Sequence, residues 1–260
     1  MTEPQAEPGE PLGKARRGLT LRAMLPNAVT VAALCAGLTG IRFAMMENWA
    51  FAVAAIVLAG VLDGIDGRIA RLLNAQSRFG AELDSLADSL SFGMAPALIL
   101  YLWALDDLPR VGWFVALAFA ICCALRLARF NAQIDTDEQP HKLAGFLTGI
   151  PAPVAAGLAF APFYVWTITD NEAFRNPVLV AVWIGSIAFL MISNVATLSW
   201  GSLRPRRGVR LELIALAGLM FTGLLLEPWW VLLGISVIYL SLMPVGIWRY
   251  AKVKRQQRSE

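Results

Sequence analysis

The chain has 260 residues, of which 57% are hydrophobic and only 16% charged, and its formal net charge is +3. Soluble domains average about a quarter charged residues, so this composition argues against a soluble globular protein. The basic residues lie in short segments between apolar runs. That distribution argues against a nucleic-acid-binding face and is typical of charge that sets membrane topology.

The two ends of the chain differ from its middle. Residues 1–20 are rich in Glu, Pro, Gly, Lys and Arg and contain no apolar run, so we expect a disordered cytoplasmic tail and not a cleaved signal peptide. Residues 251–260 are basic and are expected to form a second cytoplasmic tail. Residues 21–250 are predicted to form a single transmembrane domain.

Eight apolar segments, most of them about 20 residues long, predict eight transmembrane helices, because a bilayer-spanning helix has that length and satisfies its own backbone groups. The predicted fold class is therefore an all-α polytopic membrane helix bundle. The predicted spans are residues 23–46, 50–73, 83–105, 111–131, 147–167, 177–198, 210–226 and 228–248. The division between the last two depends only on Glu227-Pro228, and the charged second half of span two is expected to protrude from the bilayer.

The basic residues also predict an orientation. They gather before span one, between spans two and three, four and five, and six and seven, and after span eight. The other loops hold few, with Arg110 and Arg175 as the main exceptions. Since cytoplasmic loops carry the excess of Lys and Arg, we expect both termini in the cytoplasm. In a plasma (inner) membrane, the residues discussed next would then lie at the cytoplasmic face.

Four aspartates interrupt the second and third spans. Asp63 and Asp66 are three residues apart, and Asp84 and Asp88 are four apart, so each pair shares one face of its helix. A short loop makes the two helices antiparallel neighbours, which brings the four carboxylates together. Divalent cations would offset their repulsion, and a two-metal site suits phosphoryl chemistry. The alternative is a cytoplasmic loop of solvated charge, but ionisable residues within membrane segments are functional candidates by default.

Three glycines lie among these aspartates. Each costs its helix about 1 kcal/mol relative to alanine, so we expect a reason for its presence. Glycine permits close approach by a ligand or by another helix. For Gly64 the two explanations are equally good, whereas for Gly67 and Gly80, set among carboxylates, ligand approach is favoured.

The stretch as a whole resembles a known family. The pattern Asp-x-x-Asp-Gly-x-x-Ala-Arg, then Gly, Asp and Asp after gaps of eight, three and three residues, is that of the CDP-alcohol phosphotransferases. Residues 63–88 match it at every specified position. The resemblance implies that residues 21–250 are a catalytic domain, in which an acceptor hydroxyl attacks the lipid-side phosphate of a CDP-linked lipid and CMP leaves. It also implies a homodimer.

The resemblance further implies roles for individual residues. It implies four ligands for two divalent ions, Mg²⁺ or Mn²⁺: Asp63, Asp66, Asp84 and Asp88. Asp88 is also implied as the general base towards the acceptor hydroxyl. Four contacts to the CDP moiety are implied: Gly67, Ala70, Arg71 and Gly80. Asn27, early in the first span, is either a further contact to the nucleotide or a helix-packing residue.

Other stretches resemble the phosphatidylserine synthases within this family, and together the resemblance covers about residues 23–157. They are residues 25–27, 84–97, 125–131 and 149–153. This implies CDP-diacylglycerol and L-serine as substrates and phosphatidylserine as product. Arg126 and Arg129, three apart on one helical face, are predicted with Asn131 to orient the serine carboxylate, because an arginine fork binds a carboxylate through two hydrogen bonds. An equally good alternative is that the two arginines set the membrane topology of the chain or bind a lipid phosphate.

Two alternatives remain open at this point. The same chemistry with another acceptor, such as glycerol 3-phosphate, an inositol phosphate or choline, is not excluded by the number of basic residues. A cation transporter or channel would use the aspartates as an ion site near the bilayer midplane. Here the carboxylates cluster towards one membrane face, among arginines and glycines, which argues against transport.

Overall fold

The computed structural model describes residues 21–134, 146–193, 196–198 and 210–257, so the predicted tail of residues 1–20 lies outside the described residues. The α-helices are α1 Leu21–Met45, α2 Trp49–Leu72, α3 Arg78–Asp88, α4 Ala95–Leu100, α5 Pro109–Ile134, α7 Ala152–Ala159, α8 Ala161–Thr169, α9 Pro177–Ile192, α10 Arg210–Leu226 and α11 Pro228–Gln257. The remaining elements are the π-helical turns η1 Ser89–Met94 and η2 Tyr101–Leu105, the 3₁₀ turn η3 Glu172–Arg175, and the strands β1 Phe146–Thr148 and β2 Ala196–Leu198.

In the described part of the chain these elements form eight helical segments, one for each predicted span. The segment from α3 to η2 is continuous, and α7 and α8 together form one segment. Five segments are long and apolar enough to cross a bilayer: Met24–Met45, Trp49–Leu72, Arg78–Leu105, Pro109–Ala132 and Ala152–Thr169. Three apolar helices are shorter: Pro177–Ile192, Ala215–Leu226 and Pro228–Pro244. The chain is therefore an integral membrane protein.

Several predicted span boundaries differ from those of the helices. The third segment begins at Arg78 and not at residue 83, and α11 continues beyond residue 248 to Gln257. Span six was expected to reach residue 198, but α9 ends at Ile192 and residues 196–198 form β2, which pairs antiparallel with β1. Span five was expected to begin at residue 147, but its helix begins at Ala152. Pro151 disfavours a helical conformation at the residue before it, and Gly149 has a φ of +73°. A Cβ built at Gly149 would lie 2.5 Å from the Met191 carbonyl oxygen, so this turn packs directly on α9.

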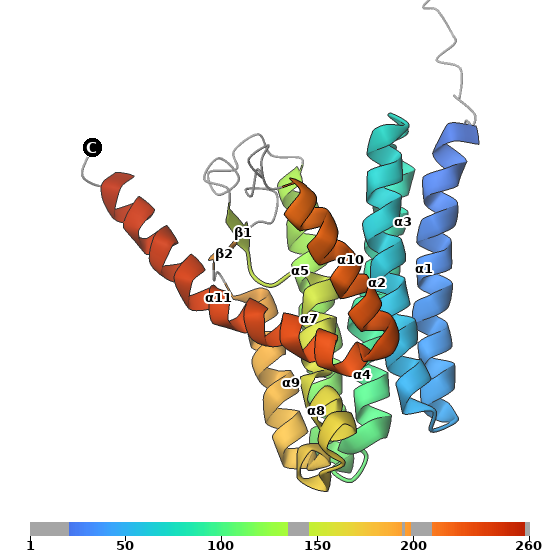
Figure 1. Cartoon of the computed structure of the whole chain (residues 1–260), viewed down its shortest axis with the longest axis vertical. Helices are drawn as coiled ribbons and strands as arrows, with labels where there is room; N and C mark the ends of the chain where they lie inside the picture. Colours follow the sequence, from blue (N-terminus) through green and yellow to red (C-terminus); the bar gives the residue numbers. More distant parts are fainter. Residues whose placement is uncertain (1–20, 135–145, 194–195, 199–209, 258–260) are drawn as a thin grey trace, which may run out of the picture.

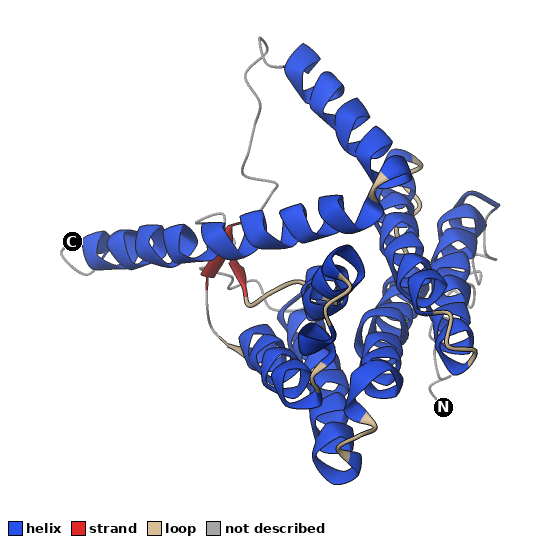
Figure 2. Cartoon of the chain, turned by 60° about the horizontal axis from the view of Figure 1, so that its bottom comes forward, coloured by secondary structure: helices blue, strands red, loops and turns tan. Residues whose placement is uncertain are grey.

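Figure 1 shows α1, α2, α3 and α5 running roughly along the long axis of the molecule, with α10 and α11 crossing the other helices. Small residues bring α1 and α2 close together: a Cβ built at Gly40 would lie 3.0 Å from the Ala52 carbonyl oxygen. Such residues allow membrane helices to approach closely without a hydrophobic driving force. In both views the C-terminal half of α11 extends away from the bundle (Figures 1 and 2).

The third segment contains a wide turn immediately after Asp88. In η1 the Ala95 amide bonds to the Leu90 carbonyl, five residues back instead of four. Pro96, which follows, has no amide to bond to the carbonyl of Phe92, and this favours a local departure from the α-helix. Single π-helical turns within α-helices occur frequently at functional sites. This one separates the polar helix α3 from the buried apolar helix α4.

Candidate metal and substrate site

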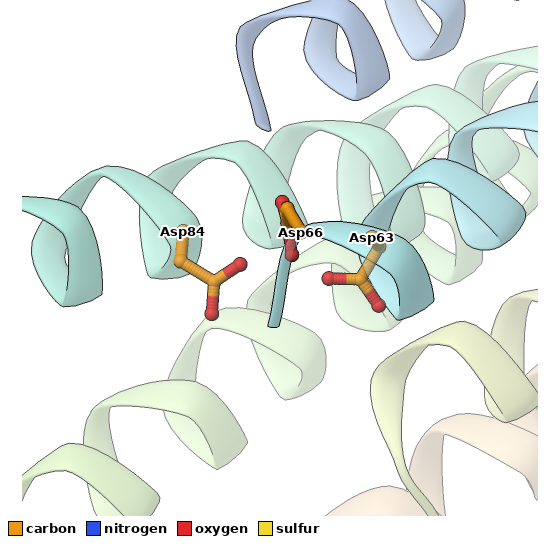
Figure 3. A group of neighbouring side chains, drawn as sticks. All are labelled: Asp63, Asp66 and Asp84. Atoms are coloured by element: carbon orange, nitrogen blue, oxygen red, sulfur yellow. The ribbon is translucent and has the colours of Figure 1, made fainter. Parts of the chain in front are cut away.

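Three carboxylates from two helices converge near one end of the bundle. Asp63 and Asp66 come from α2 and Asp84 from α3, and one oxygen atom of each lies within 4.8 Å of the other two. Figure 3 shows Asp63 and Asp84 directed toward one another with Asp66 between them. The Ser77 hydroxyl accepts a hydrogen bond from the Gly80 amide at 3.0 Å and fixes where α3 begins.

This arrangement fits a divalent cation. Oxygen ligands bind hard cations at about 2.0–2.6 Å, so oxygens around one ion lie at most about 5 Å apart. The three aspartates meet that condition and offer the carboxylate oxygens that Mg²⁺, Mn²⁺ and Ca²⁺ prefer. Asp66 is only 4% exposed, and a buried carboxylate needs a partner that compensates its charge. The cluster could therefore bind a metal ion.

Asp88 lies beside this group and is not one of its three members. Its side chain is in hydrogen-bond contact with that of Asp63 and interacts electrostatically with Asp84 and Asp66. It is half-buried at the C-terminal end of α3. The sequence predicted one cluster of four carboxylates, and the structure resolves it into three that converge tightly and a fourth in contact with Asp63.

The predicted CDP contacts surround the same helix ends. A Cβ built at Gly64 or Gly67 would meet no other helix of the described residues within 4 Å, so there is open space beside both glycines. A Cβ at Gly80 would lie 2.9 Å from Oδ1 of Asn27, which places the Asn27 side chain of α1 against α3. Arg71 is exposed, and its Nε donates to the Gly67 carbonyl at 2.9 Å.

Ala70, the remaining predicted CDP contact, is half-buried near the end of α2. Its carbonyl accepts a hydrogen bond from the Ala75 amide at 2.9 Å, which helps to close the turn between α2 and α3. The predicted CDP contacts of α2 and α3 therefore lie on either side of one short turn, with Asn27 of α1 beside them.

Of the three predicted acceptor residues of α5, Arg126 and Asn131 lie near the aspartates of α3, whereas Arg129 is exposed. Arg126 is half-buried and interacts electrostatically with Asp88, and its Nε has no hydrogen-bond partner among the described residues. Asn131 donates from Nδ2 to the Ser85 hydroxyl at 2.9 Å, between the two aspartates of α3. Arg129 is exposed, so the two arginines differ in their environments although they are three residues apart.

Three residues of the site were missed from the sequence. The Thr30 hydroxyl of α1 lies 2.6 Å from an oxygen of Asp66, Ser85 bonds to Asn131, and Tyr239 of α11 interacts electrostatically with Arg126. Ser85 could have been noticed, since it lies within the aspartate motif. Thr30 and Tyr239 could not, because their positions depend on which helices pack against α2 and α5.

An apolar cavity of about 400 Å³ lies against the part of α2 that precedes Asp63. Gly60 and Val61 of α2 line it just before that aspartate, and Tyr239 lines it from α11. The other lining residues are apolar apart from Ser236 and come from α2, η1, α7, α8 and α11, together with Phe160 between α7 and α8. The site therefore has a polar side, at the aspartates, and an apolar side within the bundle.

Comparison with known families matches residues 23–198 to the CDP-alcohol phosphatidyltransferase model, a range that contains all the residues of α1, α2, α3 and α5 discussed above. The chain belongs to the CDP-alcohol phosphatidyltransferase family. The resemblance carried by the aspartate motif is thus confirmed over two-thirds of the chain.

Three individual proteins are similar to this chain over 171 to 240 residues. A Mycobacterium bovis protein is 37% identical over 240 residues, covering 92% of this chain and 82% of its own length. A Helicobacter pylori protein is 36% identical over 176 residues, or 66% of this chain and 70% of its own. A Bacillus subtilis protein is 34% identical over 171 residues, or 66% and 88%. All three bear the name CDP-diacylglycerol–serine O-phosphatidyltransferase.

Proposed function

We propose that this protein is a phosphatidylserine synthase, which transfers the phosphatidyl group of CDP-diacylglycerol to the hydroxyl of L-serine and releases phosphatidylserine and CMP. The observation that carries the proposal is the 37% identity over 92% of the chain to a family member of that name. The convergence of Asp63, Asp66 and Asp84 supports it, because phosphoryl transfer requires compensation of developing negative charge. The catalytic domain would comprise residues 21–250.

The aspartates would hold the metal ions of this reaction. Asp63, Asp66 and Asp84 offer the oxygens of one site, and Asp88, in contact with Asp63, would complete a site for two ions, Mg²⁺ or Mn²⁺. When bound, divalent ions neutralise charge on the phosphoryl oxygens and the leaving CMP. The serine hydroxyl oxygen bonds to the lipid-side phosphorus while the bond between that phosphorus and the CMP oxygen breaks. The Asp88 carboxylate accepts the hydroxyl proton as this happens.

The two ends of the lipid substrate need different surroundings. The open surface at Gly67, together with Arg71, Gly80, Ala70 and Asn27, would receive the CDP moiety outside the bundle. The apolar cavity against the part of α2 that precedes Asp63 would accept part of an acyl chain, since its lining is almost wholly apolar. The phosphate that reacts would then lie at the aspartates, between these two regions.

The acceptor would bind on the α5 side of Asp88. The guanidinium of Arg126 is half-buried near that carboxylate, and its Nε has no partner among the residues that the structure describes. A serine carboxylate bound by Arg126 would place the serine hydroxyl near Asp88. Asn131, which is hydrogen-bonded to Ser85, would help to hold α5 against α3 at this position. The exposed Arg129 would contribute positive charge at the surface of the site.

Two features of the working enzyme are part of the proposal. The distribution of basic residues supports a site at the cytoplasmic face of the plasma (inner) membrane, with both termini in the cytoplasm. Family resemblance supports a homodimer. Both substrates could reach such a site, one from the bilayer and the other from the cytoplasm.

The choice of acceptor tests the proposal. Protein purified in detergent is supplied with CDP-diacylglycerol and Mg²⁺ or Mn²⁺, and CMP release is followed with serine, glycerol 3-phosphate, an inositol phosphate and choline in parallel. We expect release with serine alone, and its loss on chelation or in Asp88→Asn. Release with a different acceptor would keep the chemistry and contradict the serine assignment. Folded protein that releases no CMP with any of the four would contradict the proposal as a whole.

A further inference from the structure

The most buried carboxylate of the metal cluster is bonded to a helix outside the aspartate motif. Oγ1 of Thr30, on α1, lies 2.6 Å from Oδ2 of Asp66, on α2, although the two residues are 36 positions apart. Thr30 is 5% exposed and Asp66 4% exposed. Neither side chain is therefore hydrated in the usual way, and water does not readily replace the hydrogen bond between them.

The direction of this hydrogen bond follows from its partners. A hydroxyl has one hydrogen to donate, and Oγ1 of Thr30 also lies 3.1 Å from the carbonyl oxygen of Pro26. An ionised carboxylate is the stronger acceptor, and O–H···O⁻ bonds have lengths of about 2.5–2.7 Å. The shorter contact of the two is the one to Asp66. The Thr30 hydroxyl therefore donates to Asp66, and the more distant Pro26 carbonyl, which can only accept, is the weaker acceptor of the same hydrogen.

We infer that Thr30 is a positioning residue for the divalent metal site, acting through Asp66. Its hydroxyl engages Oδ2 of that carboxylate and holds the side chain in the rotamer that faces Asp63 and Asp84. Ligating carboxylates are commonly held in this way by hydrogen bonds from outside the ligand set, and losing one such bond typically costs about 10- to 100-fold in metal affinity. The inference rests on the metal site of the proposed function, and assigns α1 a part in it.

The chain offers a matched control on the same helix. The Thr39 hydroxyl of α1 donates to the Cys35 carbonyl, at 2.6 Å, and its side chain is exposed. Thr39→Val therefore makes the same chemical change, in the same helix, at a hydroxyl bonded to the backbone instead of to a carboxylate. Any general effect of replacing an α1 threonine by valine would appear in both variants.

Mn²⁺ binding to the purified protein, measured by electron paramagnetic resonance without substrates, tests the inference independently of turnover. We expect Thr30→Val to raise the Mn²⁺ dissociation constant about 10- to 100-fold. Thr30→Ser, which keeps the hydroxyl, should restore binding, and Thr39→Val should bind as the wild type does. If Thr30→Val does not fold, Thr30→Ala and Thr30→Ser make the same comparison of hydroxyl removed and hydroxyl kept.

A double-mutant cycle separates action through Asp66 from a general effect on α1. In an Asp66→Asn background, Thr30→Val should cause little further loss of Mn²⁺ affinity. An equal loss in both backgrounds, or unchanged binding by Thr30→Val, would overturn the inference. If Thr30→Val binds Mn²⁺ unchanged while the wild type binds Mn²⁺ and makes phosphatidylserine, only the role of Thr30 is contradicted and the proposed function is retained. A wild type that does not bind Mn²⁺ would instead overturn the metal site itself.

Discussion

At the residue scale, the junction between the carboxylates and α5 is the point at which acceptor choice would be decided. Asp88 contacts Asp63 on one side and interacts electrostatically with Arg126 on the other. A carboxylate in that place is well situated to receive a proton, and a guanidinium next to it to receive an anionic group of the acceptor. Arg129, one turn further along α5, is exposed and has no equivalent burial.

Replacement of Arg126 should therefore act on the acceptor more than on the lipid. We expect Arg126→Ala to raise the KM for serine roughly 10- to 100-fold, because a hydrogen bond to a charged group contributes about 1.5–3 kcal/mol. The KM for CDP-diacylglycerol should change little. Arg129→Ala should have a smaller effect on serine. Steady-state kinetics with each substrate varied in turn would measure both constants.

Arg110→Ala is the matched control, since Arg110 is an exposed arginine at the other end of α5. It should leave both KM values unchanged. A serine KM that is the same in Arg126→Ala and the wild type would contradict the acceptor role of Arg126. The arginine would then serve topology or lipid phosphate binding.

At the element scale, the turn that precedes α7 depends on one glycine. Gly149 has a φ of +73°, and a Cβ there would lie 2.5 Å from the carbonyl oxygen of Met191 on α9. The turn thus joins β1 to α7 while resting on the backbone of α9. The partner carbonyl cannot move as freely as a side chain, so a larger residue would disturb α9 as well.

Gly149→Ala should therefore destabilise the protein. A non-glycine residue at positive φ costs of order 1–3 kcal/mol, to which the contact with Met191 adds. We expect the Tm in detergent to fall by roughly 2–10 °C. Gly185→Ala, in α9, is the control, because a Cβ there meets nothing within 4 Å among the described residues. An unchanged Tm for Gly149→Ala would mean that the turn is not fixed as the structure shows.

At the scale of the whole molecule, the site lies towards one end of a bundle that crosses the bilayer. The turn between α2 and α3 lies at that end, and residues 106–108, between η2 and α5, lie at the opposite end of the segment Arg78–Leu105. The proposed orientation rests on the basic residues alone.

Cysteine accessibility in intact cells would test the orientation. In a background with Cys35, Cys122 and Cys123 replaced by alanine, we expect Asp107→Cys to react with a membrane-impermeant maleimide. Gln76→Cys, in the turn beside the site, should react only after the cells are permeabilised. Both positions are exposed, so the difference would report the side of the membrane. The reverse labelling pattern would contradict a cytoplasmic site.

The number of helical segments and their approximate bounds could be predicted from the sequence, because the length and apolarity of a bilayer-spanning helix are set locally by the lipid. Two of the boundary errors, at residues 147 and 198, occur where β1 pairs with β2. Strand pairing joins segments 50 residues apart, so the end of α9 at Ile192 has no local signal, whereas Gly149 and Pro151 do disfavour a helix before Ala152.

The family could be inferred from the resemblance of residues 63–88 to a known motif. The set of carboxylates could be inferred from spacings of three and four residues, which place side chains on one face of a helix. Which carboxylates meet, and which other helices reach them, became evident only in the folded chain. Folding brings Asp63, Asp66 and Asp84 into one tight group with Asp88 in contact with Asp63, places Arg126 but not Arg129 in a half-buried position, and brings Thr30 to Asp66. The positions of Thr30 and Arg126 depend on how α1 and α5 are rotated about their own axes, and that rotation is set by packing between helices distant in the chain.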